Sequence, residues 1–222
     1  MNKKIAIALM LSLASSASFA GGTMPPEKLL FLEGGFSYSY TLYKDSITSA
    51  ESYTVATPNG VAIDPNDFYP NNFYGGYIGA SLYMSQFLLN TRLDMYSSGC
   101  KTNSEINERG DTTEISIAPA RFSATVDRVF GDINTFSYGI GAGAVLETIN
   151  QGEFREVPPQ ADRPGGETLN GSRYDATVEA FAMYRMGNLG LKLNAAYQIP
   201  VNSLHADGDV NVNLGVNYSF PV

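Results

Sequence analysis

Apolar and polar residues alternate with a period of two through most of this chain, a periodicity typical of β-strands. From residue 174 to residue 179, for example, Tyr, Ala and Val alternate with Asp, Thr and Glu. The alternation slips near Pro119, where we expect a β-bulge or a kink, because a strand interior tolerates proline only at such positions. The pattern predicts eight strands, at residues 30–42, 74–84, 87–95, 113–126, 136–148, 174–186, 189–199 and 210–220.

The connections between these strands alternate between long and short. The long ones are residues 43–73, 97–112 and 149–172, residues 201–208 are of medium length, and short turns lie near residues 85–86, 131–134 and 187–188. A soluble β-sandwich also has alternating strands, but long extracellular loops opposite short periplasmic turns are typical of outer-membrane barrels. We therefore predict an all-β fold, an eight-stranded antiparallel up-and-down transmembrane β-barrel. We expect it in the outer membrane of a Gram-negative cell, with both termini in the periplasm.

The first residues have the pattern of a secretory signal peptide. Lys3 and Lys4 precede a short apolar run, and small residues lie at the −3 and −1 positions of a cleavage site between Ala20 and Gly21. The apolar run is too short for a membrane helix, which needs ~20 residues. We expect a cleaved signal peptide at residues 1–20, a short periplasmic segment at residues 21–28 and the barrel at residues 29–222.

The residues between the outward-facing apolar positions point into the predicted barrel. An eight-stranded barrel is just wide enough for side chains to fill it, and a buried charge without a partner is strongly unfavourable. We therefore expect a lumen filled by paired charges, with Arg92 contacting Glu179 across it. The predicted network has six acids and five bases: Glu33, Arg92, Asp94, Glu114, Arg121, Glu147, Arg173, Asp175, Glu179, Arg185 and Lys192.

The last predicted strand carries a motif of its own. Its sequence Leu-Gly-Val-Asn-Tyr-Ser-Phe resembles the C-terminal signal that the barrel assembly machinery reads, with apolar positions at Leu214, Val216, Tyr218 and Phe220. With this motif and eight strands, the chain resembles the superfamily of small barrels that includes the outer membrane protein A transmembrane domain and the opacity-type adhesins. The resemblance implies the assembly machinery, outer-membrane lipid and lipopolysaccharide as partners. Since that superfamily has structural, adhesive and pathogen-surface members, it does not fix a function.

The charge of the chain is uneven. A net charge of −8 argues against nucleic acid, whose phosphates require clustered Lys and Arg. The acids of the outer connections either keep exposed loops solvated or contact divalent cations or a basic host surface. The motifs Asp64-Pro-Asn-Asp67 and Asp207-Gly-Asp209 resemble calcium ligands in composition only. Neither has the spacing of a calcium loop, and we expect no metal or cofactor. These connections carry thirteen acids: Asp45, Glu51, Asp64, Asp67, Glu105, Glu108, Asp111, Glu153, Glu156, Asp162, Glu167, Asp207 and Asp209.

Candidate catalytic residues are few. The single histidine, His205, lies two residues from Ser203 in the last outer connection, and no recognisable catalytic motif accompanies it. We therefore expect a non-enzymatic surface barrel with a filled lumen, an envelope-structural role and loops for adhesion or recognition. A narrow, porin-like pore of low conductance is the second hypothesis, and a lipid A-modifying enzyme is the third.

Overall fold

The computed structural model describes residues 28–43, 69–97, 99–103, 112–157, 167–201 and 206–222. No helix within these ranges has the length and apolar character to cross a membrane. The predicted cleavage site and most of the predicted periplasmic segment lie outside the described residues. The strands are β1 (Leu29–Tyr43), β2 (Asn72–Met84), β3 (Phe87–Tyr96), β4 (Gly99–Asn103), β5 (Thr112–Ile117), β6 (Pro119–Gly131), β7 (Phe136–Val157), β8 (Glu167–Met186), β9 (Leu189–Pro200) and β10 (Ala206–Pro221).

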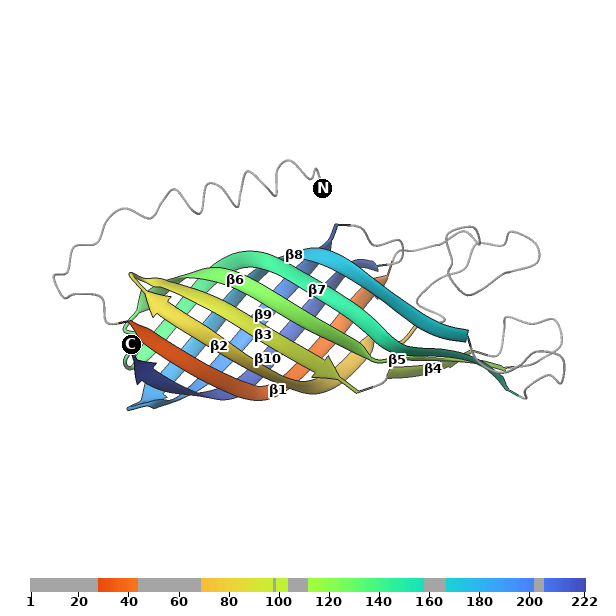
Figure 1. Cartoon of the computed structure of the whole chain (residues 1–222), viewed down its shortest axis with the longest axis horizontal. Coiled ribbons are helices and arrows are strands. Elements are labelled where there is room, and N and C mark those ends of the chain that lie inside the picture. Colours follow the sequence, from red (N-terminus) through yellow and green to blue (C-terminus); the bar gives the residue numbers. More distant parts are fainter. Residues whose placement is uncertain (1–27, 44–68, 98, 104–111, 158–166, 202–205) are drawn as a thin grey trace.

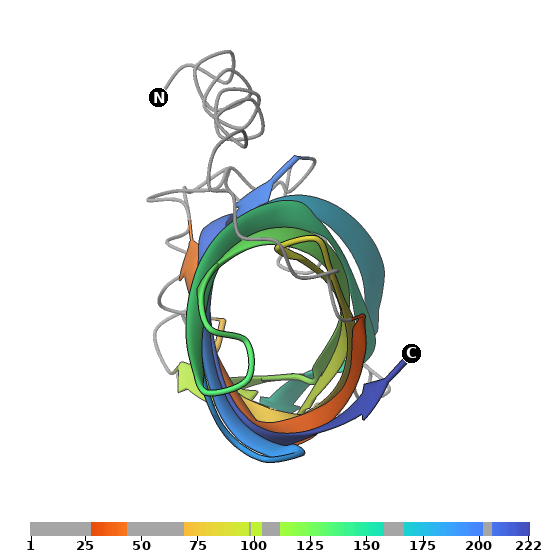
Figure 2. The ribbon, with the colours of Figure 1, turned by 90° about the vertical axis from the view of Figure 1, so that its left-hand side faces the viewer.

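Eight of these strands close into a ring. The order is β7-β6-β3-β2-β1-β10-β9-β8, every neighbouring pair is antiparallel, and a further pairing of β7 with β8 completes the circle. Figure 2 shows the ring from one end. A sheet in lipid must close in this way, because an open edge would leave backbone N–H and C=O groups without partners. The prediction of an eight-stranded antiparallel barrel is confirmed.

The two ends of the barrel differ. At one end, which we name the turn end, tight turns follow Met84, Gly131 and Met186. β1 begins and β10 ends at this same end. Ser85 and Gln86 form the first of these turns with φ of 52° and 69°, the left-handed conformations of a type I′ hairpin turn. The opposite end, where β1 ends and β2 begins, is named the loop end (Figure 1).

The sheet continues beyond the ring at the loop end. β7 reaches Val157, β8 begins at Glu167, β5 pairs with the outer part of β7, and β4 pairs with β5. We name this part the strand extension (Figure 1). The prediction of loops throughout residues 97–112 and 149–172 is therefore wrong. A strand outside lipid does not require an apolar outer face. The strand extension therefore lacks the period-two hydrophobicity from which strands were predicted.

The predicted irregularity near Pro119 is confirmed as a β-bulge. Ser116 of β5 faces Glu153, whereas Pro119 of β6 faces Ile149, so β7 has one more residue than its partner in this interval. The ladder between β7 and β8 shifts at the same place, between Ile149 and Gly152. The extra residue thus belongs to β7, and it lies where the ring ends and the strand extension begins.

The outer face of the ring is apolar and its interior is polar, the reverse of a soluble protein. Leu32, Ile78 and Val216 are half exposed or more, while Asp127 and Asn211 inside the ring are fully buried. Aromatic residues gather near both ends of the outer face, where the girdles of membrane barrels lie. Those of the turn end include Phe87, Phe130, Phe136, Tyr138, Tyr184, Tyr218 and Phe220.

The outer face of β10 generates a prediction about assembly. Phe220 is exposed on this face and its ring lies 4.8 Å from that of Tyr218. Phe220→Ala removes the terminal aromatic of the proposed assembly signal, so we expect less barrel in the outer membrane. The measurement is the amount of heat-modifiable protein, the species that runs faster in SDS when it has not been boiled.

The matched control is Phe130→Ala. Phe130 is also at the turn end and is 40% exposed, against 41% for Phe220, but it belongs to β6. We expect the control to assemble normally. Equal amounts of heat-modifiable protein in the two variants would show that Phe220 has no special part in assembly.

Candidate functional site: the lumen

The lumen near the loop end holds a cluster of ion pairs between strands distant in sequence. Arg121 of β6 pairs with Glu147 of β7 and, at 3.0 Å, with Asp209 of β10. Arg173 of β8 lies 2.9 Å from Asp175 and 3.3 Å from Glu147, and it also contacts Asp209. Two guanidinium groups therefore bind three carboxylates, and the cluster connects four strands. We name it the outer cluster.

A second group, the middle cluster, lies deeper. The predicted contact between Arg92 of β3 and Glu179 of β8 has an N–O distance of 3.6 Å, and Arg92 also pairs with Asp94 at 3.0 Å. Lys192 of β9 reaches Glu33 of β1 at 3.0 Å. Each of these side chains is nearly inaccessible to solvent, so their ion pairs form in a medium that screens charge poorly.

Uncharged polar side chains connect the two clusters. Asn213 donates to Asp94 at 2.7 Å and to the Ser37 hydroxyl at 2.8 Å, and Ser37 also donates to the Tyr96 hydroxyl at 2.9 Å. The Arg121 guanidinium lies 5.3 Å above the Tyr96 ring. Side chains of β1, β3 and β10 thereby form one hydrogen-bonded chain along the lumen, and Arg121 of β6 joins it through the Tyr96 ring.

The lumen at the turn end is apolar, which the alternation did not predict. Phe31, Phe181 and Met183 point inward, although the next inward residues on the same strands, Glu33, Glu179 and Arg185, are charged. Seven side chains gather there, which we name the apolar plug: Leu29, Phe31, Leu88, Val129, Ile133, Phe181 and Met183. Because burying apolar surface away from water is favourable, the plug packs as a small hydrophobic core inside the ring.

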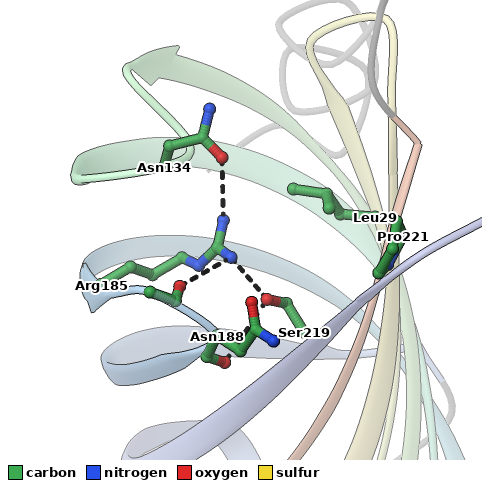
Figure 3. A pocket seen from close by; sticks show the side chains of 7 residues that line it. Leu29, Asn134, Arg185, Asn188, Ser219 and Pro221 are labelled. Atoms are coloured by element: carbon green, nitrogen blue, oxygen red, sulfur yellow. Dashed lines mark hydrogen bonds between the residues drawn. The ribbon is translucent and has the colours of Figure 1, made fainter.

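Arg185 closes the turn end over this plug. Its guanidinium donates to the Ile133 carbonyl at 2.8 Å, to the Gly187 carbonyl at 3.0 Å and to the Ser219 hydroxyl at 2.5 Å. It also lies 5.3 Å above the Phe31 ring. Figure 3 shows the side chain between Asn134 and Ser219, in a shallow pocket that Leu29 and Pro221 also line. One cation thus connects two turns and the last strand.

Glycines of β7 make room for large side chains from its neighbours. A Cβ at position 139 would lie 2.5 Å from the Phe181 ring, and one at position 141 would lie 1.8 Å from Oδ1 of Asp127. Neither side chain fits beside an alanine without movement. This stretch of β7 therefore supplies the wall of the lumen while adjacent strands supply its contents.

Most of the predicted network residues lie in the lumen. Nine are buried and Arg173 is partly exposed at the outer cluster. Glu114 belongs to β5, which is not a strand of the ring, and its side chain lies outside the described residues. The four residues of the proposed assembly signal all lie on the outer face of β10. His205 and Ser203 lie outside the described residues.

Two lumen acids were missed. Asp127 and Asp209 are both fully buried, and Asp209 was wrongly assigned to an outer connection. Val126 and Val210 face outward, so the adjacent Asp127 and Asp209 face inward. One predicted strand ended at residue 126 and the other began at residue 210, so each left its acid out by one residue. With them, the described lumen has seven carboxyl groups and five cations. In the same part of the chain no three His, Cys, Asp or Glu side chains are placed to hold a metal ion.

The fold is that of the small eight-stranded outer-membrane barrels. The chain is similar to outer membrane protein OprG from Pseudomonas aeruginosa, with a TM-score of 0.53 at 10% identity, covering 89% of this chain and 98% of that one. The N-terminal β-barrel domain of Pseudomonas aeruginosa OprF has a TM-score of 0.49 at 14% identity, over 88% and 99%.

The attachment invasion locus protein Ail of Yersinia pestis has a TM-score of 0.48 at 14% identity, over 87% of this chain and 99% of that one. No protein-family model and no curated protein sequence matches this chain. At such identities the likeness establishes the fold, and function has to be argued from the site itself.

The middle cluster generates a prediction about stability. Arg92→Ala leaves Asp94 and Glu179 buried without their guanidinium, a loss that costs about 3–5 kcal/mol. We expect a marked fall in the urea midpoint of unfolding for the barrel refolded in detergent micelles.

Arg128→Ala is the control. Arg128 lies on the outer side of β6, where its guanidinium is 5.2 Å from the Phe87 ring, a contact worth roughly 0.5–1 kcal/mol. Similar, small shifts in the two variants would mean that water replaces the lost ion pairs and that the lumen is hydrated.

Proposed function

We propose that this protein is a non-enzymatic outer-membrane barrel that stabilises the envelope and presents its loop end for adhesion or recognition. The turn end then faces the periplasm and the loop end faces outward, the orientation of outer-membrane barrels in general. The observation that carries the proposal is the filled lumen. A transport channel requires continuous water, whereas here three successive layers of side chains occupy the interior.

The apolar plug is the strongest argument against steady conduction. Phe31 and Leu88 are each 1% exposed, and Arg185 covers them at the turn end. An ion crossing this layer would lose its hydration shell without gaining polar ligands, which is strongly unfavourable. The middle cluster adds a second obstacle, since its charges already bind one another.

Conductance in a planar lipid bilayer tests this proposal. We expect no steady current from the wild-type barrel. The double variant Phe31→Ala, Phe181→Ala removes two rings of the plug and should produce current steps. The control is Phe36→Ala, Phe122→Ala, which removes two lipid-facing rings that are 52% and 49% exposed and should be silent. Steady current from the wild type would instead establish the narrow pore.

The strand extension supports the recognition part of the proposal. It continues the sheet beyond the ring through β5, β7 and β8, so its backbone is a hydrogen-bonded platform. Its strands include acids at positions 114, 153, 156 and 167. We propose that this acidic platform contacts a basic host surface, directly rather than through a bound metal.

Removing the platform tests this contact. Gly152 faces Leu169 in the ladder, so replacing residues 153–168 by Asn-Gly shortens the hairpin in register. We expect the shortened barrel to remain heat-modifiable while cells displaying it lose adhesion to host cells.

A second variant separates charge from shape. Glu153→Gln with Glu156→Gln and Glu167→Gln retains the strands and removes three charges, and we expect it to lose adhesion as well. Unchanged adhesion in the shortened barrel would place recognition elsewhere. Loss in the shortened barrel alone would show that shape, and not charge, is recognised.

A further inference from the structure

Asp127, a carboxyl group beside the middle cluster, and Glu179 of that cluster lie on the two sides of a glycine. Gly141 of β7 faces Asp127 on β6 and Glu179 on β8, so the three residues form one rung across three strands. Both acids point into the lumen, where Asp127 is fully buried and Glu179 is 5% exposed. A Cβ at position 141 would lie 1.8 Å from Oδ1 of Asp127. The missing side chain therefore leaves room for both carboxyl groups beside the same amide nitrogen, that of Asn90.

Shared donors hold the pair together. The Asn90 amide donates to Asp127 and, at 3.3 Å, to Oε1 of Glu179. Glu179 also accepts from the Thr125 hydroxyl at 2.5 Å and from the Asn194 amide at 3.0 Å. Oδ1 of Asp127, by contrast, accepts no hydrogen bond from any described residue. If both carboxyl groups were ionised, they would repel each other strongly, because this medium screens charge poorly.

The surrounding charges compensate Glu179 but leave Asp127 without an ion pair. Arg92 pairs with Glu179 and with Asp94, and Lys192 pairs with Glu33. Tyr77 of β2 lies near Glu33, Arg92 and Asp94. Among the described residues no cation lies within 4.0 Å of the Asp127 carboxyl. With Asp127 included, this part of the lumen has four carboxyl groups for two cations.

We propose that Asp127 and Glu179 form a proton-binding site, in which one proton is shared between the two carboxyl groups at neutral pH. The proton resides on Asp127, whose O–H donates to Glu179, while Glu179 remains the partner of Arg92. This arrangement supplies a donor where two acceptors would otherwise meet, and it reduces the surplus of negative charge in the lumen.

The shared proton couples stability to pH. In the unfolded chain both carboxyl groups lose their protons near pH ~4, whereas the folded pair retains one. The folded state therefore binds one more proton above that pH, and the barrel loses stability as pH rises until the pair itself ionises. Over this window the unfolding equilibrium constant should increase about tenfold per pH unit.

Infrared spectroscopy detects the proton directly. The wild-type barrel at neutral pH should show the C=O stretch of a protonated carboxyl group, and both Asp127→Asn and Glu179→Gln should lose it. Asp207→Asn, which alters an exposed acid of β10, should retain the band. Absence of the band in the wild type, or its persistence in both lumen variants, would overturn the proposal.

Urea unfolding between pH 5 and 8 provides the second readout. Asp127→Asn should reduce the pH slope by about one proton and should be more stable than the wild type at the alkaline end. A sodium or potassium dependence of wild-type stability, with no protonated-carboxyl band, would instead assign the missing charge to a bound monovalent cation. The infrared band is measured in the wild type and in three variants. If one variant folds poorly, the others still test the proposal.

Discussion

The requirement that every backbone N–H and C=O group find a partner in lipid governs the rest of this structure. It forces the first strand onto the last, so that β1 and β10 pair from Leu29 to Tyr43 without an open edge. Once the ring is closed, alternate side chains must face either lipid or lumen. The apolar belt, the charged interior and the close approach of strands distant in sequence all follow from that division.

The parts of the fold in lipid could be predicted from sequence because lipid imposes a strict period on them. Outward residues such as Leu32 and Val216 gave the strand number and the phase. Strand ends were harder to predict, because residues outside the hydrocarbon need not alternate between apolar and polar. For this reason residues 150–157 of β7 were taken for a loop, and Asp127 and Asp209 were left out of the lumen.

The apolar plug shows a different limit of sequence reasoning. Phe181 and Met183 alternate with the outward residues Ala180, Ala182 and Tyr184 of β8. Both faces of the strand are therefore apolar there, and the alternation does not show which face is inside. Only the ring brings these side chains together with Phe31 and Leu88 from other strands. The lumen is therefore two environments, a dry core at the turn end and a polar network above it. A fixed charge is paired in the network, and it would be costly in the core.

The length of β7 sets how far this protein reaches from the membrane. Its 22 residues form one strand, roughly 70 Å long at ~3.3 Å per residue. With the tilt usual for such barrels, the strand rises roughly 50 Å, whereas the apolar band is ~25 Å tall. Its tip therefore stands off from the lipid by a distance on the order of 20 Å. In the orientation proposed above, a partner can engage that tip without descending to the lipid headgroups.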